Sequence, residues 1–584
     1  MSVPASLTEA LLERCADDAG ATALVVPGGG AAAAGRLLSY GELDRRARSL
    51  AARLQRDGQA GRPVLVPMTA DGPEPAVAVL GCLYAGAVAV PVPPPGDSRA
   101  DLERTAAIAE ETGAGLVLTR AASAPAVSRQ FTARGTGSPV CLAVDHGAAP
   151  DPGEWRPPRL AGGDPALIQY TSGSTAAPRG VTVTQSGLLA AVAAAQAALR
   201  TGRASRIGGW LPLHHGPALV AQLLHPLRLG AAAVLPGGHA ADRPLHWLAE
   251  TALHGVTAVL APDSVYARCL AEATDADLER LDLSRLETAV SATEPVSAAV
   301  LTAFAARFAR AGLRPGVLAC GYSPAEACLS AVGAVGDGSV RRSADAAELE
   351  AGRLRPAAPG ARARAVVGGR PVPAVEIRVV DPASRAELPD GAVGEVWVRG
   401  PSVGAGYWRR PLETAESFGC ATAAGAGGFL RTGDLGALWD GVLYVTGRTR
   451  DTLTVHGRAL HPQEVERLLA GGPRLVSAAV FAVGDGLEHL VAVQEVRGSA
   501  VSSAELSGAA RQVRRCLAEE FGATADGLLL VRPGTVRRAT AGRVSRSVVR
   551  ELFLRGELRS LHTELSPGLA DWLAGAAGAG RGLR

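Results

Sequence analysis

Short apolar runs alternate with helical segments through the first part of this 584-residue chain, and this rhythm limits the fold most. The runs are residues 63–67, 87–92, 115–119 and 140–144. Each is short enough for one strand and apolar on both faces, as expected of strands in a buried parallel sheet. A similar rhythm covers residues 166–336. The pattern therefore predicts an α/β fold built of parallel βαβ subdomains.

The pattern changes after about residue 365, where short strands follow one another with turns between them. They are residues 373–381, 394–408 and 441–448, and they predict a small β-barrel-like subdomain. From Asp451 onward, strands and helices alternate in a compact end piece. We expect an N-terminal domain over residues 1–450 and a small, mobile α+β C-terminal domain over residues 451–584.

Composition excludes several classes of protein. The chain has 59 basic and 56 acidic residues, so there is no electrostatic case for a nucleic-acid partner. Its eight cysteines form no C-x-x-C pair and are expected to be reduced and mostly buried. The most apolar stretch, residues 75–94, is interrupted by glycine and reads as a buried helix followed by a strand. We therefore expect a cytoplasmic protein without membrane insertion.

The stretch PALIQYTSGSTAAPRGVTV, residues 165–183, carries the first sign of chemistry. An apolar strand runs into a loop of small hydroxylated residues around a glycine, namely Thr171, Ser172, Gly173, Ser174 and Thr175. Open backbone N–H groups and hydroxyls in such a loop can bind phosphate oxygens, and Arg179 adds a cation. An ordinary surface loop is the alternative. The phosphate loop of nucleoside triphosphatases is excluded, because G-x-x-x-x-G-K-[ST] is absent.

With this loop, the sequence resembles the adenylate-forming superfamily, which activates acyl and aminoacyl groups. Five further motifs follow in the order found in that superfamily. They are SATEPV at 291–296, GYSPAEACL at 321–329, RTGDLG at 431–436, YVTGRTRD at 444–451 and ATAGRVSR at 539–546. Each motif is weak alone, because Asp434 could cap a turn and Glu326 a helix; their order and spacing favour the resemblance.

The resemblance implies a nucleotide site. Tyr322 would stack on adenine, and Asp434 would accept hydrogen bonds from the ribose hydroxyls. Arg448 would lie near the ribose and phosphate. The adenine-binding loop would contain Thr293, Glu294 and Pro295.

The resemblance also implies the groups that act on phosphate and on the carboxylate substrate. Glu326 would hold Mg²⁺, and Arg179 would act with the loop at 171–175 on the phosphates of ATP. Arg543 would bring a cation onto the carboxylate and α-phosphate. His215 stands at the histidine of the W-L-P-L-x-H segment. The expected cofactors are ATP and Mg²⁺.

Several features look like the fatty acyl-AMP ligases within this superfamily. The segment at residues 208–235 contains WLPLHH, and residues 457–466 match a second segment of the group. Residues 339–357 stand where the group carries an insertion that limits domain movement and coenzyme A use. The implied substrate is a fatty or related carboxylic acid, whose acyl group passes to an acyl carrier protein. Small residues at 218–224 either line an acyl tunnel or pack as an ordinary helix.

The chain departs from the family pattern at several positions. Arg179 and Arg543 replace family lysines, and the two side chains are not interchangeable. Four further differences are Gly216, Ala292, Ser323 and Ala459. Two alternatives to the ligase therefore stay open: an acyl- or aryl-CoA ligase, and a catalytically degenerate homologue that binds nucleotide or carrier protein.

The whole chain contains no lysine and no asparagine, and isoleucine occurs four times. Coding-level pressure explains all three, because their codons are rich in A and T. Protection from amine-reactive acyl species would explain the lysines alone. We favour the coding-level explanation.

Overall fold

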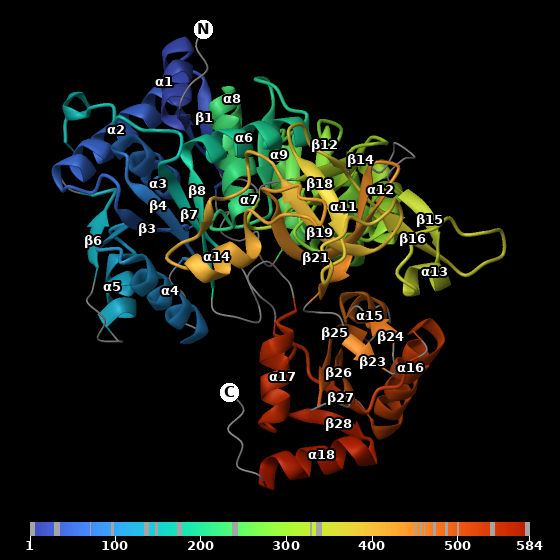
Figure 1. Cartoon of the computed structure of the whole chain (residues 1–584). Coiled ribbons are helices and arrows are strands. Elements are labelled where there is room, and N and C mark those ends of the chain that lie inside the picture. The colour runs from blue at the N-terminus through green and yellow to red at the C-terminus, as the bar shows by residue number, and fades with distance from the viewer. Residues whose placement is uncertain are drawn as a thin grey trace.

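The computed structural model describes most of the chain in eighteen stretches. They are residues 6–28, 35–69, 72–94, 99–132, 139–146, 150–171, 178–235, 243–327, 330–334, 341–449, 453–455, 458–460, 462–470, 475–484, 489–498, 502–521, 523–537 and 544–578. Figure 1 shows a large N-terminal part above a smaller C-terminal part. This confirms the predicted α/β class, with a large N-terminal and a small C-terminal domain. The boundary at 450/451 stays a prediction, since residues 450–452 lie outside the described stretches.

A nine-stranded sheet carries much of the large domain. The strands from β13 to β1 in its order run parallel, and antiparallel strands β17, β14 and β2 lie at its edges. The order is β17 (Arg370–Pro371), β14 (Ala331–Ala334), β13 (Leu318–Tyr322), β12 (Thr288–Ser291), β11 (Ala258–Ala261), β9 (Arg206–Gly209), β10 (Ala232–Val234), β1 (Thr22–Val26) and β2 (Arg36–Ser39).

A seven-stranded sheet forms the second layer of strands. Its order is β20 (Gly406–Tyr407), β8 (Gly180–Thr184), β7 (Pro165–Tyr170), β4 (Val88–Val92), β3 (Pro63–Pro67), β5 (Leu116–Thr119) and β6 (Val140–Ala143). The strands from β7 to β6 are parallel, whereas β8 and β20 add antiparallel pairs. The four apolar runs of the sequence are therefore confirmed as β3, β4, β5 and β6.

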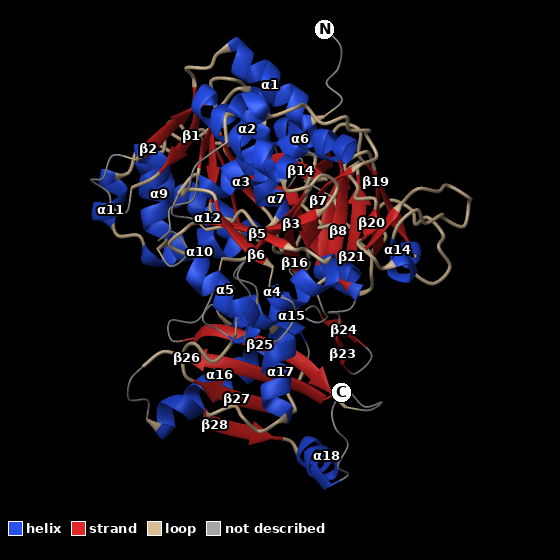
Figure 2. Cartoon of the chain, turned by 90° about the vertical axis from the view of Figure 1, so that its left-hand side faces the viewer, coloured by secondary structure: helices blue, strands red, loops and turns tan. Residues whose placement is uncertain are grey.

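Helices cover and join the two sheets (Figure 2). They are α1 (Leu7–Asp17), α2 (Tyr40–Arg56), α3 (Glu74–Ala85), α4 (Arg99–Thr112), α5 (Ala124–Thr132), α6 (Gln185–Leu199), α7 (Gly216–Ala218), α8 (His225–Leu229), α9 (Pro244–Leu253), α10 (Asp263–Glu272), α11 (Asp275–Arg280) and α12 (Ala298–Phe308). The apolar stretch at 75–94 forms α3 and β4, and every residue of α3 is buried. In the described parts of the chain, no helix has an apolar stretch long enough to cross a membrane.

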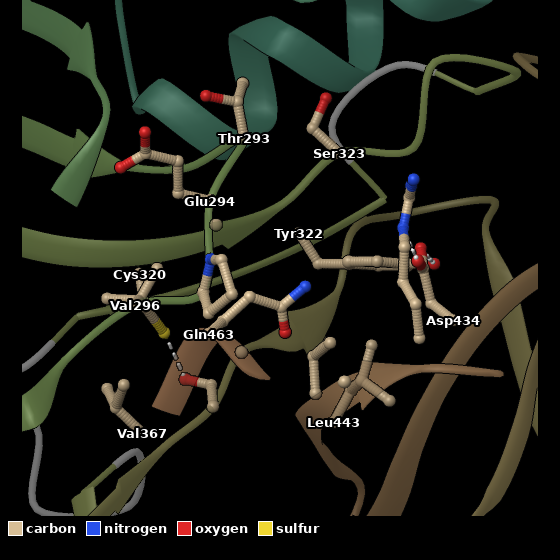
Figure 3. Close-up of a pocket in the computed structure, with 17 residues that line it drawn as sticks. Thr293, Glu294, Val296, Cys320, Tyr322, Ser323, Val367, Asp434, Leu443 and Gln463 are labelled. Atoms are coloured by element: carbon tan, nitrogen blue, oxygen red, sulfur yellow. Dashed lines mark hydrogen bonds and ion pairs between the residues drawn. The ribbon is translucent and has the colours of Figure 1, made fainter. Parts of the chain in front are cut away.

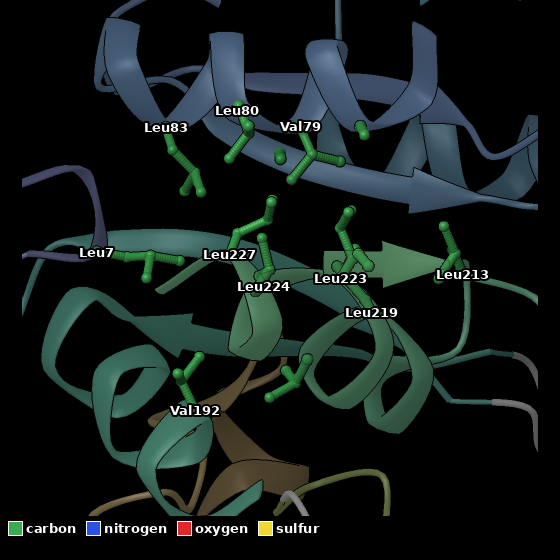
Figure 4. Packing of buried hydrophobic residues seen from close by; sticks show 14 of the residues in the cluster. Leu7, Val79, Leu80, Leu83, Val192, Leu213, Leu219, Leu223, Leu224 and Leu227 are labelled. Atoms are coloured by element: carbon green, nitrogen blue, oxygen red, sulfur yellow. The ribbon is translucent and has the colours of Figure 1, made fainter. Parts of the chain in front are cut away.

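The largest hydrophobic cluster lies where α3, α6 and a π-helix at Leu219–Leu224 meet. Figure 4 shows leucines of the π-helix facing Val79 and Leu80 of α3, with Val192 of α6 on the other side. Leu219 and Leu223 have no exposed surface. This arrangement favours helix packing over a tunnel lining for these residues.

A third, antiparallel sheet is formed by β18 (Glu376–Val380), β19 (Gly394–Arg399), β21 (Leu430–Trp439) and β22 (Val442–Arg448), with helix α14 (Pro411–Ser417) between β20 and β21. It contains the strands predicted after residue 365, except that the end of the stretch at 394–408 forms β20 of the seven-stranded sheet. A hairpin of β15 (Arg341–Asp345) and β16 (Ala363–Val367) stands beside it, with α13 (Ala346–Glu350) between its strands. This hairpin contains the described part of the segment expected to be the insertion.

The C-terminal part has its own hydrophobic clusters. Its sheet runs in the order β25 (Leu475–Val483), β26 (His489–Val496), β27 (Gly527–Val531) and β28 (Ser560–Leu565), and β23 (Leu453–Val455) pairs with β24 (Arg458–Leu460). The helices are α15 (Pro462–Leu469), α16 (Ser503–Phe521), α17 (Arg546–Leu554) and α18 (Pro567–Gly578). An α+β piece of this kind is what the sequence predicts.

Two arginines connect the hairpin to the C-terminal end of α16. Arg362 and Arg364 both donate to the backbone carbonyl of Glu520, at 3.2 and 3.4 Å. Both also pair with Glu350 of α13. The Arg364 guanidinium lies 5.5 Å from the centre of the Phe521 ring. Because the last carbonyls of a helix lack internal partners and carry partial negative charge, two cations suit this position.

We expect the double variant R362A/R364A to expose the C-terminal turn of α16 without unfolding the protein. Half-exposed ion pairs contribute about 1 kcal/mol or less each, so the melting temperature should change by only a few degrees. Hydrogen exchange at residues 517–521 should rise at least threefold, as measured by mass spectrometry. E520A is the matched control, because the acceptor is the backbone carbonyl. Unchanged exchange in the double variant would contradict this role.

Candidate nucleotide-binding site

A pocket lies at the carboxyl ends of β12 and β13, where the nine-stranded sheet faces the third sheet. Parallel strands deliver the residues that follow them to one edge, which is where open α/β sheets bind ligands. The pocket is lined by Thr293–Val296 after β12, by Cys320–Ser323 of β13 and by residues of β22 (Figure 3). Gln463 of α15 adds a side chain from the C-terminal domain.

Asp434 is the charged centre of this pocket. Its side chain accepts a 2.7 Å hydrogen bond from the Tyr322 hydroxyl on one oxygen and a 2.6 Å bond from Nε of Arg448 on the other. Asp434 and Arg448 are direct partners in the β21–β22 ladder, so strand register sets this pair. Burial raises the pKa of Tyr322 well above its ordinary value, which keeps its hydroxyl a donor.

The loop after β12 has an unusual backbone. Thr293 has a φ of +71°, which is rare for a side-chain-bearing residue and costs energy unless the surroundings hold it. Its Oγ1 is buried and has no hydrogen-bond partner among the residues that the structure describes. Glu294 holds the loop in place, because its carboxylate accepts from the backbone N–H and the hydroxyl of Ser264, at 3.0 and 3.1 Å.

A second group of charged residues lies where β8 meets β20. Arg179 precedes β8 and pairs with Glu326 at 3.7 Å. The Tyr407 hydroxyl donates to the same Glu326 oxygen at 2.7 Å, and the Arg179 guanidinium lies 4.3 Å from the centre of the Tyr407 ring. The structure therefore brings the two predicted residues, Arg179 and Glu326, into contact.

The predicted phosphate loop is described only at its ends. Ser172, Gly173, Ser174 and Thr175 lie outside the described residues, as does Arg543 of the C-terminal motif. Before the gap, Arg104 donates to the Thr171 carbonyl at 2.8 Å. After it, the Arg179 N–H donates to Thr171 Oγ1 at 3.3 Å, and Thr171 N–H donates to the Arg179 carbonyl at 2.9 Å. The two ends of the loop are thus held together.

His215 is not among the residues that line the nucleotide pocket. The centre of its ring lies 4.5 Å from that of the His214 ring, and the two planes are tilted by 37°. Each ring has a buried nitrogen that has no hydrogen-bond partner among the described residues. Burial, with Arg104 nearby, lowers the pKa of His215 to about 4. Burial also lowers the pKa of His214 well below its ordinary value, with help from His215 and Arg104. Both histidines are neutral at pH 7.

The donor set suits Mg²⁺ held together with a nucleotide. Mg²⁺ takes one or two protein carboxylates and completes its shell with phosphate oxygens and water. Glu326 offers one carboxylate beside the phosphate loop, and its side chain is only 11% exposed. Within the described residues, no cluster of three or more histidine, cysteine or acidic side chains could hold a metal without such help.

Sequence reasoning missed some residues of the site. Tyr407 lies in GAGYW at residues 404–408, a stretch that does not reveal the contact with Arg179. Gln463 lies in the matching segment at 457–466, but the resemblance gave it no role at the nucleotide. The Val367–Gly369 edge of the pocket lies outside the motifs, and its position depends on how the sheets pack.

The described motif residues thus form two contacting groups, Tyr322–Asp434–Arg448 between two sheets and Arg179–Glu326 beside β8. The sequence model of the family described as AMP-binding enzyme matches residues 11–408. The chain belongs to this family, in its group of fatty acyl-AMP ligases.

Curated relatives and solved structures agree with this assignment. The long-chain-fatty-acid–AMP ligase FadD23 of Mycobacterium tuberculosis is 33% identical, over 90% of this chain and 92% of the relative. The medium-chain-fatty-acid–[acyl-carrier-protein] ligase JamA of Moorena producens is 32% identical, over 89% of this chain and 90% of the relative. The structure of a fatty acyl-adenylate ligase from L. pneumophila with acyl adenylate and pyrophosphate has a TM-score of 0.74 at 26% identity, covering 96% of this chain and 98% of that one.

We expect H215F to weaken the loss of stability at acidic pH. The folded pKa of His215 is about 4, below the ordinary value near 6.5. The unfolded chain therefore binds a proton that the folded protein does not. The free energy of unfolding should fall as pH drops from about 6.5 to 4, and His215 alone should account for roughly 3 kcal/mol of that fall.

Denaturant titration between pH 4 and 7.5 measures this. In H215F, the free energy of unfolding should vary less steeply with pH, by the equivalent of up to one bound proton. H146F is the matched control, because His146 is exposed. An H215F curve parallel to that of the natural protein would contradict the assignment.

Proposed function

We propose that this chain uses ATP to convert a fatty or related carboxylic acid into an acyl adenylate, and then transfers the acyl group to the thiol of an acyl carrier protein. The observation that carries the proposal is the buried Asp434, held between Tyr322 and Arg448 in the pocket, together with the contact of Arg179 with Glu326. The fatty-acid and carrier-protein parts are supported by the printed activities of relatives such as JamA.

The pocket residues supply the nucleotide contacts in this proposal. Asp434 accepts hydrogen bonds from the ribose hydroxyls, and Arg448 fixes its orientation. The ring of Tyr322 gives the adenine a flat apolar surface. Thr293 Oγ1, which is buried and has no partner within the described part of the chain, bonds to the base or to a bound water, with Glu294 and Pro295 shaping the loop around it.

The second group of residues acts on the phosphates. Arg179 and the loop from Thr171 to Thr175 bind the phosphate oxygens, and Glu326 holds Mg²⁺. The metal supplies neutralisation of the phosphate charge. Preorganised donors and cations of this kind are the main source of catalysis in phosphoryl-group chemistry. Arg543 brings its positive charge to the substrate carboxylate and the α-phosphate.

The first half-reaction activates the acid. A carboxylate oxygen attacks the α-phosphorus of ATP, and the bond from that phosphorus to the bridging oxygen of pyrophosphate breaks. The electron pair leaves with pyrophosphate. In the second half-reaction the carrier thiolate attacks the acyl carbon, a thioester forms, and AMP leaves with the carboxylate oxygen.

A coenzyme A ligase is less well supported. Arg362 and Arg364 connect the hairpin to α16, a contact that suits the insertion's expected role of limiting domain movement. A degenerate binding protein would keep the same contacts among the nucleotide residues. The ligase is favoured over it by the names of the matching relatives.

Mass spectrometry of the products tests the proposal. The purified protein is incubated with ATP, Mg²⁺ and a panel of fatty and aryl acids, alone, with coenzyme A, or with a phosphopantetheinylated carrier protein. The proposal predicts acyl adenylate that persists with coenzyme A and an acylated carrier. Acyl-coenzyme A as the main product would support the alternative ligase. ATP binding without any adenylate would support the degenerate homologue.

We expect D434N to raise the dissociation constant for ATP at least tenfold. Asparagine keeps the shape but removes the charge that accepts from the ribose, and a hydrogen bond to a charged group contributes about 1.5–3 kcal/mol. Isothermal calorimetry measures the affinity.

The matched control is D440N, on the turn after β21. Asp440 pairs with Arg342 and has a side chain that is 63% exposed, so ATP affinity should not change. An affinity of D434N within twofold of that of the natural protein would remove Asp434 from the nucleotide site.

A further inference from the structure

The guanidinium of Arg179 lies between an aromatic ring and a carboxylate. Its central carbon is 4.3 Å from the centre of the Tyr407 ring, well inside the distance at which a cation is attracted to an aromatic face. Nη2 of Arg179 is 3.7 Å from Oε1 of Glu326. The Tyr407 hydroxyl donates to that same oxygen at 2.7 Å. One tyrosine therefore contacts both charged residues of the proposed phosphate site.

Backbone pairing fixes the place of this tyrosine. Tyr407 pairs with Val181 and Gly406 with Thr182 in the β20–β8 ladder, and Trp408 N–H donates to the Gly180 carbonyl at 2.6 Å. Arg179 is the residue before β8, so the ladder holds the tyrosine ring beside it. On the other side, Gly404 N–H donates to the Glu326 carbonyl at 2.9 Å.

Helix α14 and the residue after it also contact Tyr407. The backbone N–H of Tyr407 donates to Thr414 Oγ1 at 2.9 Å, and its ring packs edge-on against Phe418 with centroids 5.0 Å apart. The residue is only 6% exposed. Burial and the neighbouring Glu326 raise the pKa of Tyr407 above its ordinary value, so the hydroxyl stays a donor.

A guanidinium fits this arrangement better than an ammonium. The flat face of arginine stacks on a ring while the N–H groups at its edge remain able to bond to a carboxylate or a phosphate. A lysine ammonium is also attracted to an aromatic ring, but it has no flat face. Its N–H groups that turn toward the ring are therefore lost to a phosphate, and an ammonium that turns to the phosphate loses the ring.

We propose that Tyr407 is the positioning residue of the phosphate site: its ring holds Arg179 and its hydroxyl orients Glu326, so that the site is built for arginine at position 179. This inference rests on the proposed function, since it concerns binding of Mg²⁺ with ATP. On this inference, arginine in place of the family lysine at position 179 suits its surroundings and does not mark a loss of function. When ATP binds, its phosphates replace Glu326 as the partner of Arg179, while the ring keeps the guanidinium in place.

A double-mutant cycle tests the coupling between the two side chains. The dissociation constant of MgATP is measured by calorimetry, without the acid substrate, for the natural protein, R179K, Y407L and R179K/Y407L. We expect R179K to weaken binding about five- to thirtyfold with Tyr407 present, which corresponds to the roughly 1–2 kcal/mol of a partly desolvated cation–π contact. In the Y407L background the same exchange should change binding less than twofold.

Two results would overturn the inference. One is R179K binding MgATP as tightly as the natural protein or more tightly. The other is an equal loss on R179K in both backgrounds, because the ring would then contribute nothing to Arg179. If the natural protein does not bind MgATP at all, both the proposed function and this inference fail. If it binds MgATP but Arg179 and Tyr407 show no coupling, only the inference fails.

Y407F separates the ring from the hydroxyl and protects the test from misfolding of Y407L. It keeps the stacking surface, so ATP affinity without Mg²⁺ should stay within twofold of the natural value. It removes the hydrogen bond to Glu326, so the Mg²⁺ concentration needed for half-maximal MgATP binding should rise at least threefold. An unchanged Mg²⁺ requirement would remove the hydroxyl from the proposal.

The chain offers a matched control far along the sequence from this site. Arg48 lies 4.7 Å from the centre of the Trp155 ring and pairs with Asp44 at 2.7 Å, and the Tyr84 hydroxyl donates to Asp44 at 3.1 Å. This set repeats the arginine, aromatic ring, carboxylate and tyrosine hydroxyl of the proposed site. R48K should leave MgATP binding unchanged. A loss equal to that of R179K would make the effect a general consequence of the exchange and would overturn the inference.

Discussion

The structure depends most on how a buried aspartate charge is compensated where two sheets meet. Asp434 is 5% exposed, and an unpaired carboxylate at such a place would cost several kcal/mol. Arg448, opposite it in the β21–β22 ladder, and Tyr322, at the end of β13, supply the compensation. The same contacts join the third sheet to the nine-stranded sheet and form one wall of the pocket. A fold requirement and a binding requirement are therefore met by the same three side chains.

Local sequence patterns predicted the elements well, because each depends on neighbours along the chain. The run at 63–67 is β3, and the stretch at 75–94 becomes α3 and β4. The antiparallel strands at the sheet edges were not predicted, since β8, β14 and β20 owe their direction to long-range pairing. Within the end piece, β28 and α17 lie where charged residues interrupt the apolar pattern, and α18 lies where small residues do so.

Part of the site was predictable, because some of its residues lie in sequence motifs. Tyr322, Asp434 and Arg448 lie in motifs, and the structure brings them together. Glu294 lines the pocket as expected, and its carboxylate bonds to Ser264. The roles of Tyr407 and Gln463 were not predicted, because the β20–β8 register and the approach of α15 depend on long-range packing. The structure also bears on the absence of lysine, because it shows that the arginine at position 179 lies over the ring of Tyr407. Coding-level pressure can remove lysine safely where such a partner exists.

Exchange of labelled pyrophosphate into ATP tests the central claim most directly. It needs both the nucleotide pocket and the phosphate site, and it reports reversible formation of an acyl adenylate without any carrier. The account predicts exchange that requires Mg²⁺, depends on the added fatty acid and is lost in D434N. Absence of exchange with every acid, or exchange at the same rate without acid, would contradict it.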